Sequence, residues 1–427
     1  MSLKMNIIYN TAISAVNAAL KTYARFLPKT PRYKFQEFVK GRVGLIRRVY
    51  QEMANDDKSL PVVWFHASSL GEYAIARPLI ARLKAKRKVR IVMTFFSPSG
   101  YRVVSKNHQD IDHVFYLPLD TILNTSNFVK AVNPAAAVFL VSEYWPNMLQ
   151  TLKFKAIPTF LVSAKIRSDA PFFKWYGKIY RDALSTYKHF FVLDEDSRFN
   201  LKMLGWDNMT VSGDPLFDNA SLMARTEWSD PVIERFIADG RPVFMAGSVS
   251  EKNDIALVAE TVNRHPQIRS IIVPHDIGRR QIEAIQQSLE RKAVLYSQVT
   301  ENTDFSQIDT LIIDSVGKLA YLYRYATMAY VGGGFTPLLH SVIEATVYGV
   351  PVSFGPCIER KITPQQMIEL GIGQMVRTPE ELSSWVDKFT PGLLAEIKEK
   401  CAEYVERNLG ATPKIVNMIE HYVWPTE

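Results

Sequence analysis

The length, composition and charge of the chain exclude several classes of protein. At 427 residues it is too long for one ordinary hydrophobic core, so we expect two domains. A hydrophobic content of 47% and a charged content of 22% are those of a folded globular protein and not of a disordered one. The two cysteines, Cys357 and Cys401, exclude a disulfide framework and fit a reducing compartment. The net charge of +8 favours an anionic partner: nucleic acid, phosphorylated lipid, a membrane surface or a nucleotide.

The first residues of the chain form an amphipathic segment. Apolar side chains recur at helical spacing between residues 6 and 27, and three polar residues, Asn10, Asn17 and Lys21, interrupt them. The segment is therefore too polar for a membrane span. The pattern is typical of a helix in the membrane interface, and equally of a helix packed on its own domain. Basic residues that could meet anionic headgroups follow it: Lys29, Arg32, Lys34, Lys40, Arg42, Arg47 and Arg48.

Beyond residue 60 the chain alternates between short apolar runs and stretches of helical length. This alternation predicts an α/β fold of two doubly wound domains, each a parallel sheet covered by helices, with a cleft between them. A strand-free stretch at 220–240 predicts a linker with a short helix. We therefore expect a membrane-associating segment at 1–50, a first domain at 51–219 and a second at 241–427. The expected strands are 62–67, 90–96, 114–119, 136–141, 159–164, 189–193, 210–212, 243–246, 270–273, 294–296, 311–314, 328–331 and 351–354.

Two glutamates follow predicted strands of the first domain. Residues 62–67 form an apolar run, a turn of small residues follows, and a helix begins near Glu72. Residues 136–141 form a second run, which leads to Glu143. Ligands of parallel sheets bind beyond the carboxyl ends of the strands, and two carboxylates there can divide acid and base roles. Alternatively, each glutamate only complements the start of its own helix.

Glycine-rich and polar turns follow predicted strands of the second domain. Gly332, Gly333 and Gly334 close one strand and lead to His340 and Glu344, whose spacing of four predicts one face of one helix. Backbone amides of such turns can approach a phosphate, and a carboxylate beyond them can bind a ribose. Further turns of this kind begin at residues 247, 274 and 314. The sequence has no clustered metal ligands, so we expect neither a metal nor a cofactor.

Together these residues resemble the 3-deoxy-D-manno-octulosonic acid (Kdo) transferases of lipopolysaccharide synthesis. The segment His66-Ala67-Ser68-Ser69-Leu70-Gly71-Glu72 is similar to the family motif H-A-x-S-x-G-E. Glu143-Tyr144-Trp145-Pro146-Asn147 resembles the end of E-x-E-L-W-P-N, with Val141 in the place of the first Glu. Further similarities, in the order of the family, are Val211-Ser212-Gly213 with Phe217-Asp218, Gly332-Gly333 with His340 and Glu344, Gly349-Val350-Pro351, and Asn408-Leu409-Gly410-Ala411.

The resemblance implies a GT-B glycosyltransferase: two Rossmann-like domains face a central cleft, and the last helix packs back on the first domain. It implies inverting, metal-independent transfer of Kdo from CMP-Kdo to a lipid A precursor, at the cytoplasmic face of the bacterial inner membrane and with no nucleic acid as partner. Glu72 would be the general base and Glu143 a second carboxylate of the site. The donor would be bound by Ser248, Arg279, Val316, Gly317, Leu319, Gly333, His340, Ser341 and Glu344. On the acceptor side the resemblance implies Ser69 and Gly71.

The carboxylate of Kdo needs a cation, for which Lys165, at a strand end, is our candidate and Arg279 the second. Other positions depart from the family pattern. Leu216 stands where the family has Lys, and Lys318 stands where it has Glu. Ser341 replaces the Asn after His340.

These departures leave three alternatives open: a related glycosyltransferase with another donor, a nucleotide-sugar epimerase of the same architecture, or a non-catalytic protein that binds lipid at a membrane surface. The amphipathic N-terminal segment disfavours the epimerase, and the retained Glu72 disfavours the non-catalytic protein.

Overall fold

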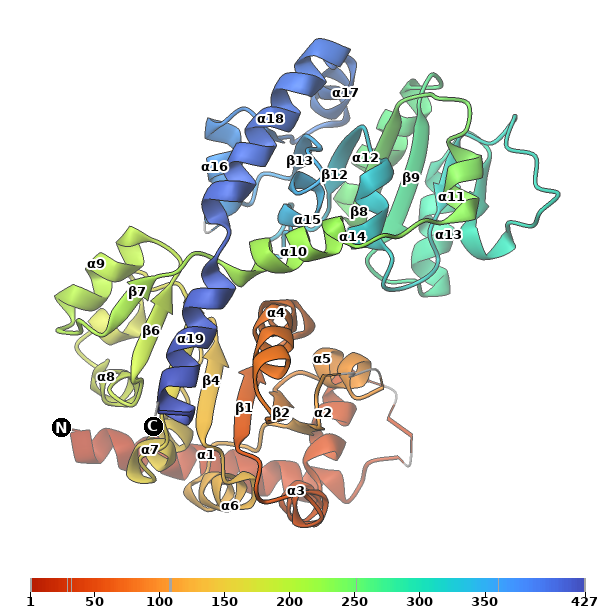
Figure 1. Cartoon of the computed structure of the whole chain (residues 1–427). Coiled ribbons are helices and arrows are strands. Elements are labelled where there is room, and N and C mark those ends of the chain that lie inside the picture. Colours follow the sequence, from red (N-terminus) through yellow and green to blue (C-terminus); the bar gives the residue numbers. More distant parts are fainter. Residues whose placement is uncertain are drawn as a thin grey trace. The chain divides into compact units, whose positions relative to one another are not determined.

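The computed structural model describes residues 2–28, 30–31, 33–106, 110–250, 252–359 and 361–425. The chain divides into two compact units, the first formed by residues 1–219 with 409–427 and the second by residues 220–408 (Figure 1). Each unit contains one parallel sheet of seven strands. Two basic residues of the predicted membrane-facing run, Lys29 and Arg32, lie outside the described residues.

The sheet of the first unit has the order β3-β2-β1-β4-β5-β6-β7. Its strands are β1 (Val62–Ala67), β2 (Arg90–Phe95), β3 (His113–Tyr116), β4 (Ala136–Leu140), β5 (Thr159–Ala164), β6 (His189–Val192) and β7 (Met209–Val211). Its helices are α1 (Ser2–Ala24), α2 (Lys34–Arg42), α3 (Leu45–Ala54), α4 (Leu70–Lys86), α5 (Pro98–Val104), α6 (Ile122–Val132), α7 (Pro146–Phe154), η1 (Pro171–Phe173), α8 (Lys178–Leu184), α9 (Glu195–Met203) and α19 (Ala411–Val423), and α10 (Pro215–Arg225) leads out of it.

The sheet of the second unit has the order β10-β11-β9-β8-β12-β13-β14. Its strands are β8 (Val243–Val249), β9 (Arg269–Pro274), β10 (Ala293–Leu295), β11 (Thr310–Ile312), β12 (Met328–Val331), β13 (Val352–Phe354) and β14 (Gly373–Met375). Its helices are α11 (Pro231–Phe236), α12 (Lys252–Arg264), α13 (Arg279–Ser288), η2 (Tyr296–Gln298), α14 (Leu319–Leu322), η3 (Tyr323–Tyr325), α15 (Ile343–Thr346), α16 (Ile362–Glu369), α17 (Pro379–Asp387) and α18 (Pro391–Asn408).

The central strands of the first unit are buried on both faces, which explains their continuous apolar runs. Trp64 and Phe65 are neighbours on β1, and neither is exposed to solvent. They belong to different hydrophobic clusters because successive strand residues point to opposite faces of a sheet. A strand with two buried faces fixes the position of its carboxyl end, from which the site residues follow.

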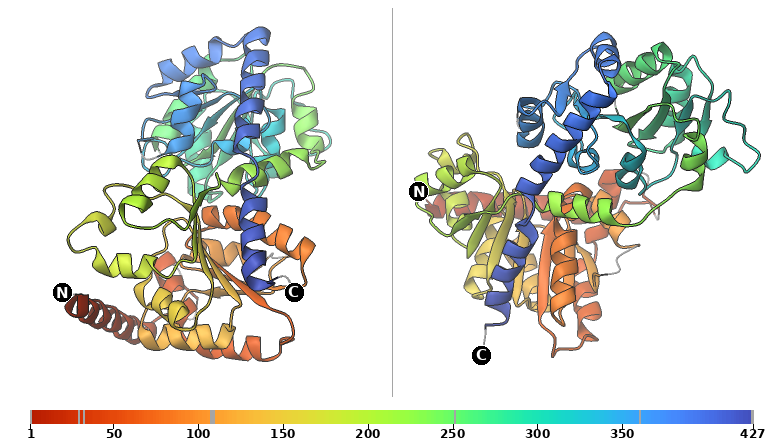
Figure 2. Two further views of the ribbon diagram at one scale, coloured as in Figure 1. Left: turned by 60° about the vertical axis from the view of Figure 1, so that its left-hand side comes forward. Right: turned by 45° about the horizontal axis from the view of Figure 1, so that its top comes forward.

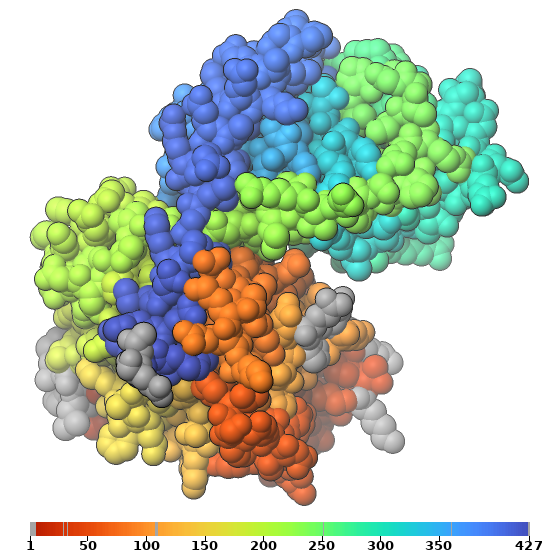
Figure 3. Space-filling view, viewed as in Figure 1, coloured from red at the N-terminus to blue at the C-terminus, as the bar shows by residue number. Residues whose placement is uncertain are grey.

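The last helix of the chain packs on the first unit. Ile415 and Ile419 of α19 are fully buried in the same cluster as Ile75 and Leu79 of α4 (Figures 1 and 2). The surfaces of α4 and α19 lie side by side in Figure 3. Asp218 accepts hydrogen bonds from the backbone N–H groups of Gly410 (2.8 Å) and Thr412 (2.6 Å) at the start of α19. Two of the family-like stretches, 192 residues apart, thus meet at one carboxylate.

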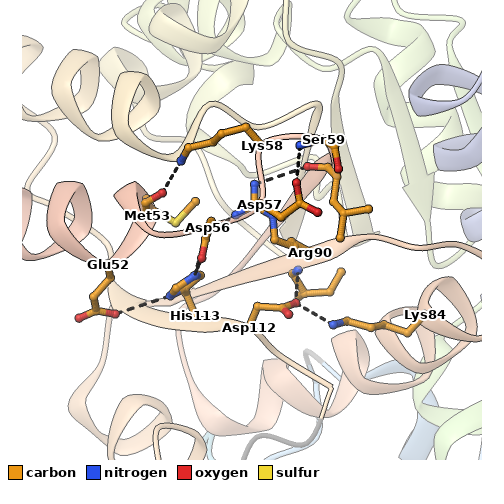
Figure 4. Close-up of polar contacts among 12 residues, drawn as sticks. Glu52, Met53, Asp56, Asp57, Lys58, Ser59, Lys84, Arg90, Asp112 and His113 are labelled. Carbon is orange, nitrogen blue, oxygen red and sulfur yellow. Dashed lines mark hydrogen bonds and ion pairs between the residues drawn. The ribbon is translucent and has the colours of Figure 1, made fainter.

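A polar cluster ties together the amino-terminal ends of the strands, at the edge of the sheet opposite to Glu72 (Figure 4). Asp56, after α3, pairs with Arg90 at the start of β2 and lies 2.9 Å from Nε2 of His113 at the start of β3. Asp112 accepts hydrogen bonds from the Lys84 ammonium and the Ile91 amide, both at 2.7 Å. The members of this cluster are engaged with one another, which is typical of structural ion pairs.

No helix within the described part of the chain is long and apolar enough to cross a membrane. Helix α1 has two kinds of surface. Tyr9 donates a hydrogen bond of 2.7 Å to Asp120, and Asn10 accepts one of 2.7 Å from Asn147, so one side packs on the first unit. Ile7, Ile8 and Phe26, on α1 or just beyond it, are largely exposed.

Candidate active site

The structure brings Glu72 and Glu143 together within the first unit. Helix α4 begins at Leu70, slightly earlier than the predicted start near Glu72, and Glu72 lies in its first turn. Glu143 lies between β4 and α7, and β4 is hydrogen-bonded directly to β1. Ser68 joins the two carboxylates: its backbone N–H donates to Glu72, and its hydroxyl donates to Glu143. The predicted convergence at adjacent strand ends is therefore present.

Glu143 is a buried carboxylate held by several donors. Its side chain accepts hydrogen bonds from the Ser68 hydroxyl and the Trp145 indole N–H. Nε2 of His66 lies 3.5 Å from its second oxygen. Burial alone would raise the pKa of Glu143, but the nearby His66 ring and the hydrogen bonds from Ser68 and Trp145 outweigh it and lower that pKa. Glu143 is therefore a fixed negative charge at neutral pH.

Glu72 has the opposite electrostatic setting. Burial raises its pKa to about 7, the Ser68 amide opposes this rise, and the negative charge of Glu143 adds to it. A carboxylate with a pKa near neutrality can accept a proton and release it again at physiological pH. Two neighbouring carboxylates whose pKa values are pushed apart are the usual arrangement for dividing acid–base and electrostatic roles.

His66 and Thr94 support Glu143 from within the sheet, and neither was among the predicted site residues. His66 is fully buried on β1, and its Nδ1 lies 2.8 Å from the Thr94 hydroxyl and 3.1 Å from the Thr94 carbonyl. The His66 ring therefore lies between Thr94 and Glu143, and its Nε2 faces the carboxylate. The signal that could have identified His66 is a histidine inside an otherwise apolar strand, within the motif that ends in Glu72.

The backbone is strained two residues before Glu143. Val141 follows β4 with φ of 69°, the left-handed region that a β-branched residue rarely adopts. Its N–H donates to the Val162 carbonyl at 2.8 Å, which fixes this conformation. The turn occurs at the position where the family motif has its first Glu, and it leads the chain from the sheet to Glu143.

The other predicted residues of the first unit differ in their surroundings. Ser69 is the N-cap of α4, and its hydroxyl accepts from the Glu72 N–H at 3.4 Å. At Gly71 an added Cβ would have only the Ser69 hydroxyl near it, at 3.9 Å, so open space lies beside this turn. Lys165 pairs with Asp194, the N-cap of α9. The role of Lys165 toward the sugar carboxylate stays a prediction. That role would require its ammonium to contact the sugar while it remains paired with Asp194.

Several predicted donor residues gather at the carboxyl ends of β8 and β12, which pair with each other. Ser248 has a φ of 54° and lies at an irregularity in the pairing of β8. Its carbonyl oxygen is so close to Gly332 that a Cβ added at Gly332 would lie only 2.3 Å from it. The rings of His340 and His275 are 4.5 Å apart. Gly333, with φ of 83°, would bring a Cβ within 2.5 Å of the Leu338 carbonyl, so a side chain is excluded there.

Two expectations for this region were wrong. His340 does not lie on a helix with Glu344, because α15 begins only at Ile343 and the His340 N–H donates to the Gly332 carbonyl at 3.2 Å. The amides of Gly332 and Gly333 are not available to a phosphate. They donate to the Gly247 carbonyl and to Asp254, both at 2.9 Å.

Glu344 is partly buried, and this burial raises the pKa of its carboxyl to about 7. Within the described residues its side chain has no hydrogen-bond or ion-pair partner. A carboxylate that is shielded from much of the solvent and has no protein donor can accept hydrogen bonds from a ligand. Glu344 thus has the properties expected of a residue that binds ligand hydroxyls. Ser341 lies three positions before it, in the irregular segment after His340.

The remaining donor-side residues lie in the loop before α14 and at the first positions of α14 and α13. Val316 is exposed, Gly317 has φ of 84°, and the N–H groups of both donate no hydrogen bond within the described part of the chain. Leu319 approaches Gly247, where an added Cβ would be 3.0 Å from it. Arg279 is almost fully exposed and pairs with Glu283, 2.6 Å away, so the structure does not gather it with the others.

Lys318, which departs from the family pattern, is engaged within the second unit. Its ammonium donates to Asp230 at 2.7 Å and to the Tyr296 hydroxyl at 2.5 Å. It also lies 4.2 Å from the Tyr296 ring centroid. These contacts explain how a lysine is accommodated at this position.

Comparison with known proteins shows similarity to one family of transferases. The family model of 3-deoxy-D-manno-octulosonic-acid transferase (kdotransferase) matches residues 38–219. The chain is 26% identical to a 3-deoxy-D-manno-octulosonic acid transferase of Chlamydophila psittaci, over 82% of each chain. It is 24% identical to one of Bordetella pertussis, over 84% of this chain and 87% of that protein.

The solved structures show the fold. The UDP-GlcNAc 2-epimerase of Neisseria meningitidis matches 84% of this chain and 98% of its own, with a TM-score of 0.58 at 13% identity. MurG of Acinetobacter baumannii matches 84% of this chain and 99% of its own, with a TM-score of 0.52 at 13% identity. With its two Rossmann-like units, the chain has a GT-B fold, and over more than four fifths of its length it is similar in sequence to 3-deoxy-D-manno-octulosonic acid transferases.

Proposed function

We propose that the protein transfers Kdo from CMP-Kdo to a hydroxyl of a lipid A precursor, with Glu72 as the general base. The observation that carries this proposal is the carboxylate pair, Glu72 with a pKa of about 7 and Glu143 with a lowered pKa, joined by Ser68 in a chain similar to Kdo transferases. A base poised near the working pH and a permanent negative charge are what the reaction needs.

The reaction is a single displacement with inversion. The acceptor hydroxyl oxygen forms a bond to the anomeric carbon of Kdo, the bond from that carbon to the CMP phosphate breaks, and CMP leaves with the electron pair. The hydroxyl proton passes to Glu72. Positive charge grows on the sugar ring in the transition state, and the charge of Glu143 favours it.

The second unit is proposed to hold the nucleotide. Glu344 would accept hydrogen bonds from the ribose hydroxyls, which gives its partly buried carboxylate the donors that the protein does not supply. The N–H groups of Val316 and Gly317 would face the departing phosphate, since those of Gly332 and Gly333 are already used. His340, stacked near His275, would border the same region.

The proposed location is the cytoplasmic face of the bacterial inner membrane. Exposed apolar residues on or beside α1, among them Ile7, Ile8 and Phe26, support this location. Lys21 and Arg25 are exposed along the same segment and suit an anionic surface.

A second candidate is transfer from another nucleotide sugar. The observation that favours it is Lys318, whose ammonium is committed to Asp230 and Tyr296 where the family has a carboxylate. Such a change would alter the donor and leave Glu72 and Glu143 in their roles.

Incubation with donor and acceptor tests both candidates. The protein is mixed with a lipid A precursor and, in parallel, with CMP-Kdo or with a panel of other CMP- and UDP-sugars, and the lipid product is analysed by mass spectrometry. A mass gain of one Kdo residue with CMP-Kdo alone supports the first candidate. A gain with another donor supports the second, and no gain with any donor contradicts both.

A further inference from the structure

The first unit contains a cavity of about 630 Å³ between α1, the turn from α2 to α3, and the start of α6. This volume lies in the range of sites for small organic ligands. Much of its wall is apolar, and includes Leu20, Ala24, Val39, Leu45, Leu119 and Leu123. Leu123 is largely exposed, as is Val43, another lining residue, so the apolar surface continues out of the cavity.

The same cavity carries a strongly one-sided charge. Lys21, Arg25, Arg42 and Arg47 line it, and the lining includes no Asp or Glu. Lys21, Arg25 and Arg47 are exposed, so they lie at the mouth. None of these three has an ion-pair partner within the described ranges. An apolar interior with unpaired cations at its opening is complementary to a molecule with a hydrocarbon chain and an anionic head.

The wall of the cavity connects to the carboxylate pair through two side chains. Arg42 donates to the Phe96 carbonyl at 2.9 Å and to the Leu117 carbonyl at 3.0 Å, which fixes it beneath the ends of β2 and β3. The Phe96 ring is 4.9 Å from the Trp145 ring, and the Trp145 indole donates to Glu143. The cavity therefore lies near the edge of the sheet at which Glu72 and Glu143 converge.

We propose that this cavity receives an acyl chain of the phosphorylated lipid acceptor, with Lys21, Arg25 and Arg47 around its phosphate. The proposal rests on the proposed function for the identity of the acceptor. The apolar wall contributes affinity in proportion to chain length, about fourfold for each buried methylene. The cations select a phosphorylated head, and the position of Arg42 places the anchored lipid beside the base.

Alkyl phosphates test the cavity without any donor. Binding of decyl phosphate, hexyl phosphate and decyl maltoside to the full chain is measured by isothermal titration calorimetry below their critical micelle concentrations. Decyl phosphate should bind at least tenfold more tightly than each of the other two. Equal affinities for decyl and hexyl phosphate, or for decyl phosphate and decyl maltoside, would contradict an acyl cavity with a phosphate-selective mouth.

Two matched variants locate the binding. Ala24→Trp fills the cavity, and Ala19→Trp places the same side chain at an exposed position of α1 outside the lining. Ala24→Trp should weaken decyl phosphate binding at least tenfold, and Ala19→Trp should bind it like the wild type. Similar affinities of the two variants would overturn the assignment. If Ala24→Trp does not fold, the surface double variant Arg25→Gln with Arg47→Gln decides, because it should weaken decyl phosphate and not decyl maltoside.

Transfer kinetics separate this proposal from the proposed function. Ala24→Trp should raise KM for the acylated acceptor at least tenfold with a much smaller change in kcat. If it weakens decyl phosphate binding and leaves this KM as in the wild type, the cavity holds a bilayer lipid and the acceptor assignment is wrong. If the wild type transfers nothing to any acceptor, the proposed function fails, and the alkyl phosphate measurements still decide whether the cavity takes a chain.

Discussion

Glu72 and Glu143 are bound to the same residue, Ser68, through its backbone N–H and its hydroxyl respectively. This shared contact keeps the two carboxylates close enough for the charge of Glu143 to raise the pKa of Glu72. His66 and Trp145 meanwhile keep Glu143 ionised. The difference in pKa between these two glutamates thus arises from their burial and from the hydrogen-bond donors around each.

The pH dependence of transfer should follow the ionisation of Glu72. Burial and Glu143 raise its pKa to about 7, and a general base acts only when deprotonated, so kcat/KM should fall on acidification. We expect a decrease of about tenfold per pH unit below pH 7 and a plateau above pH 8. Rates between pH 5.5 and 9 with saturating donor give the profile. A rate that rises toward acidic pH would assign Glu72 to a protonated role.

CMP affinity should depend on Glu344. A hydrogen bond to a charged group contributes about 1.5–3 kcal/mol, so Glu344→Ala should raise the dissociation constant of CMP roughly tenfold or more. Burial raises the pKa of Glu344 to about 7, and ribose hydroxyls favour the ionised form, so affinity should also weaken from pH 8 to pH 6.

The isosteric variant Glu344→Gln separates these effects by calorimetry. It retains any pH dependence that belongs to the CMP phosphate and loses the part that belongs to the carboxylate. Identical pH dependence in the wild type and in Glu344→Gln would show that this carboxyl does not bind the nucleotide.

Vesicle binding should depend on the exposed apolar residues of the N-terminal segment. Phe26→Glu places a charge on a residue that is 80% exposed and should weaken binding to anionic vesicles. Phe199→Glu makes the same change on α9, at a residue that is 63% exposed, and should not. Salt should weaken the electrostatic part, because exposed charges are screened over about 8 Å at physiological ionic strength. If both variants lose vesicle binding equally in a flotation assay, the protein binds the membrane through another part of its surface.

Transfer should continue after treatment with a chelator. The sequence has no clustered metal ligands, and within the described residues no group of three or more His, Cys, Asp or Glu side chains could hold a metal ion. We expect the rate with excess EDTA to equal that of untreated protein. Loss of activity that Mg²⁺ or Mn²⁺ restores would show that the leaving phosphate depends on a cation.

The architecture could be predicted where apolar runs mark buried parallel strands. The run from Val62 to Ala67 is buried on both faces, as its composition indicates. β14 was missed because Gly373-Gln374-Met375 contains no apolar run. The helical spacing of His340 and Glu344 was misleading because the His340 N–H is held by the Gly332 carbonyl, an interaction between positions eight residues apart.

The candidate site could be predicted only in part. The convergence of Glu72 and Glu143 follows from parallel topology, since the carboxyl ends of neighbouring strands share one edge. The double contact of Ser68, the support from Thr94 and the resulting difference in pKa depend on side chains from three strand ends. The cavity beside α1 is formed by residues as far apart in sequence as Asn17 and Asn127, and no local pattern predicts it.

The single-turnover rate of Glu72→Gln tests the central claim most directly. The variant keeps the shape and hydrogen bonding of Glu72 and cannot accept the proton. With CMP-Kdo and a lipid A precursor, the rate should therefore fall about 100-fold or more. CMP affinity should stay as in the wild type, and stability at pH 8 should not decrease, because a carboxylate whose pKa is raised in the folded state destabilises that state once ionised. A near-wild-type rate would contradict the account, and loss of folding would assign Glu72 to capping α4.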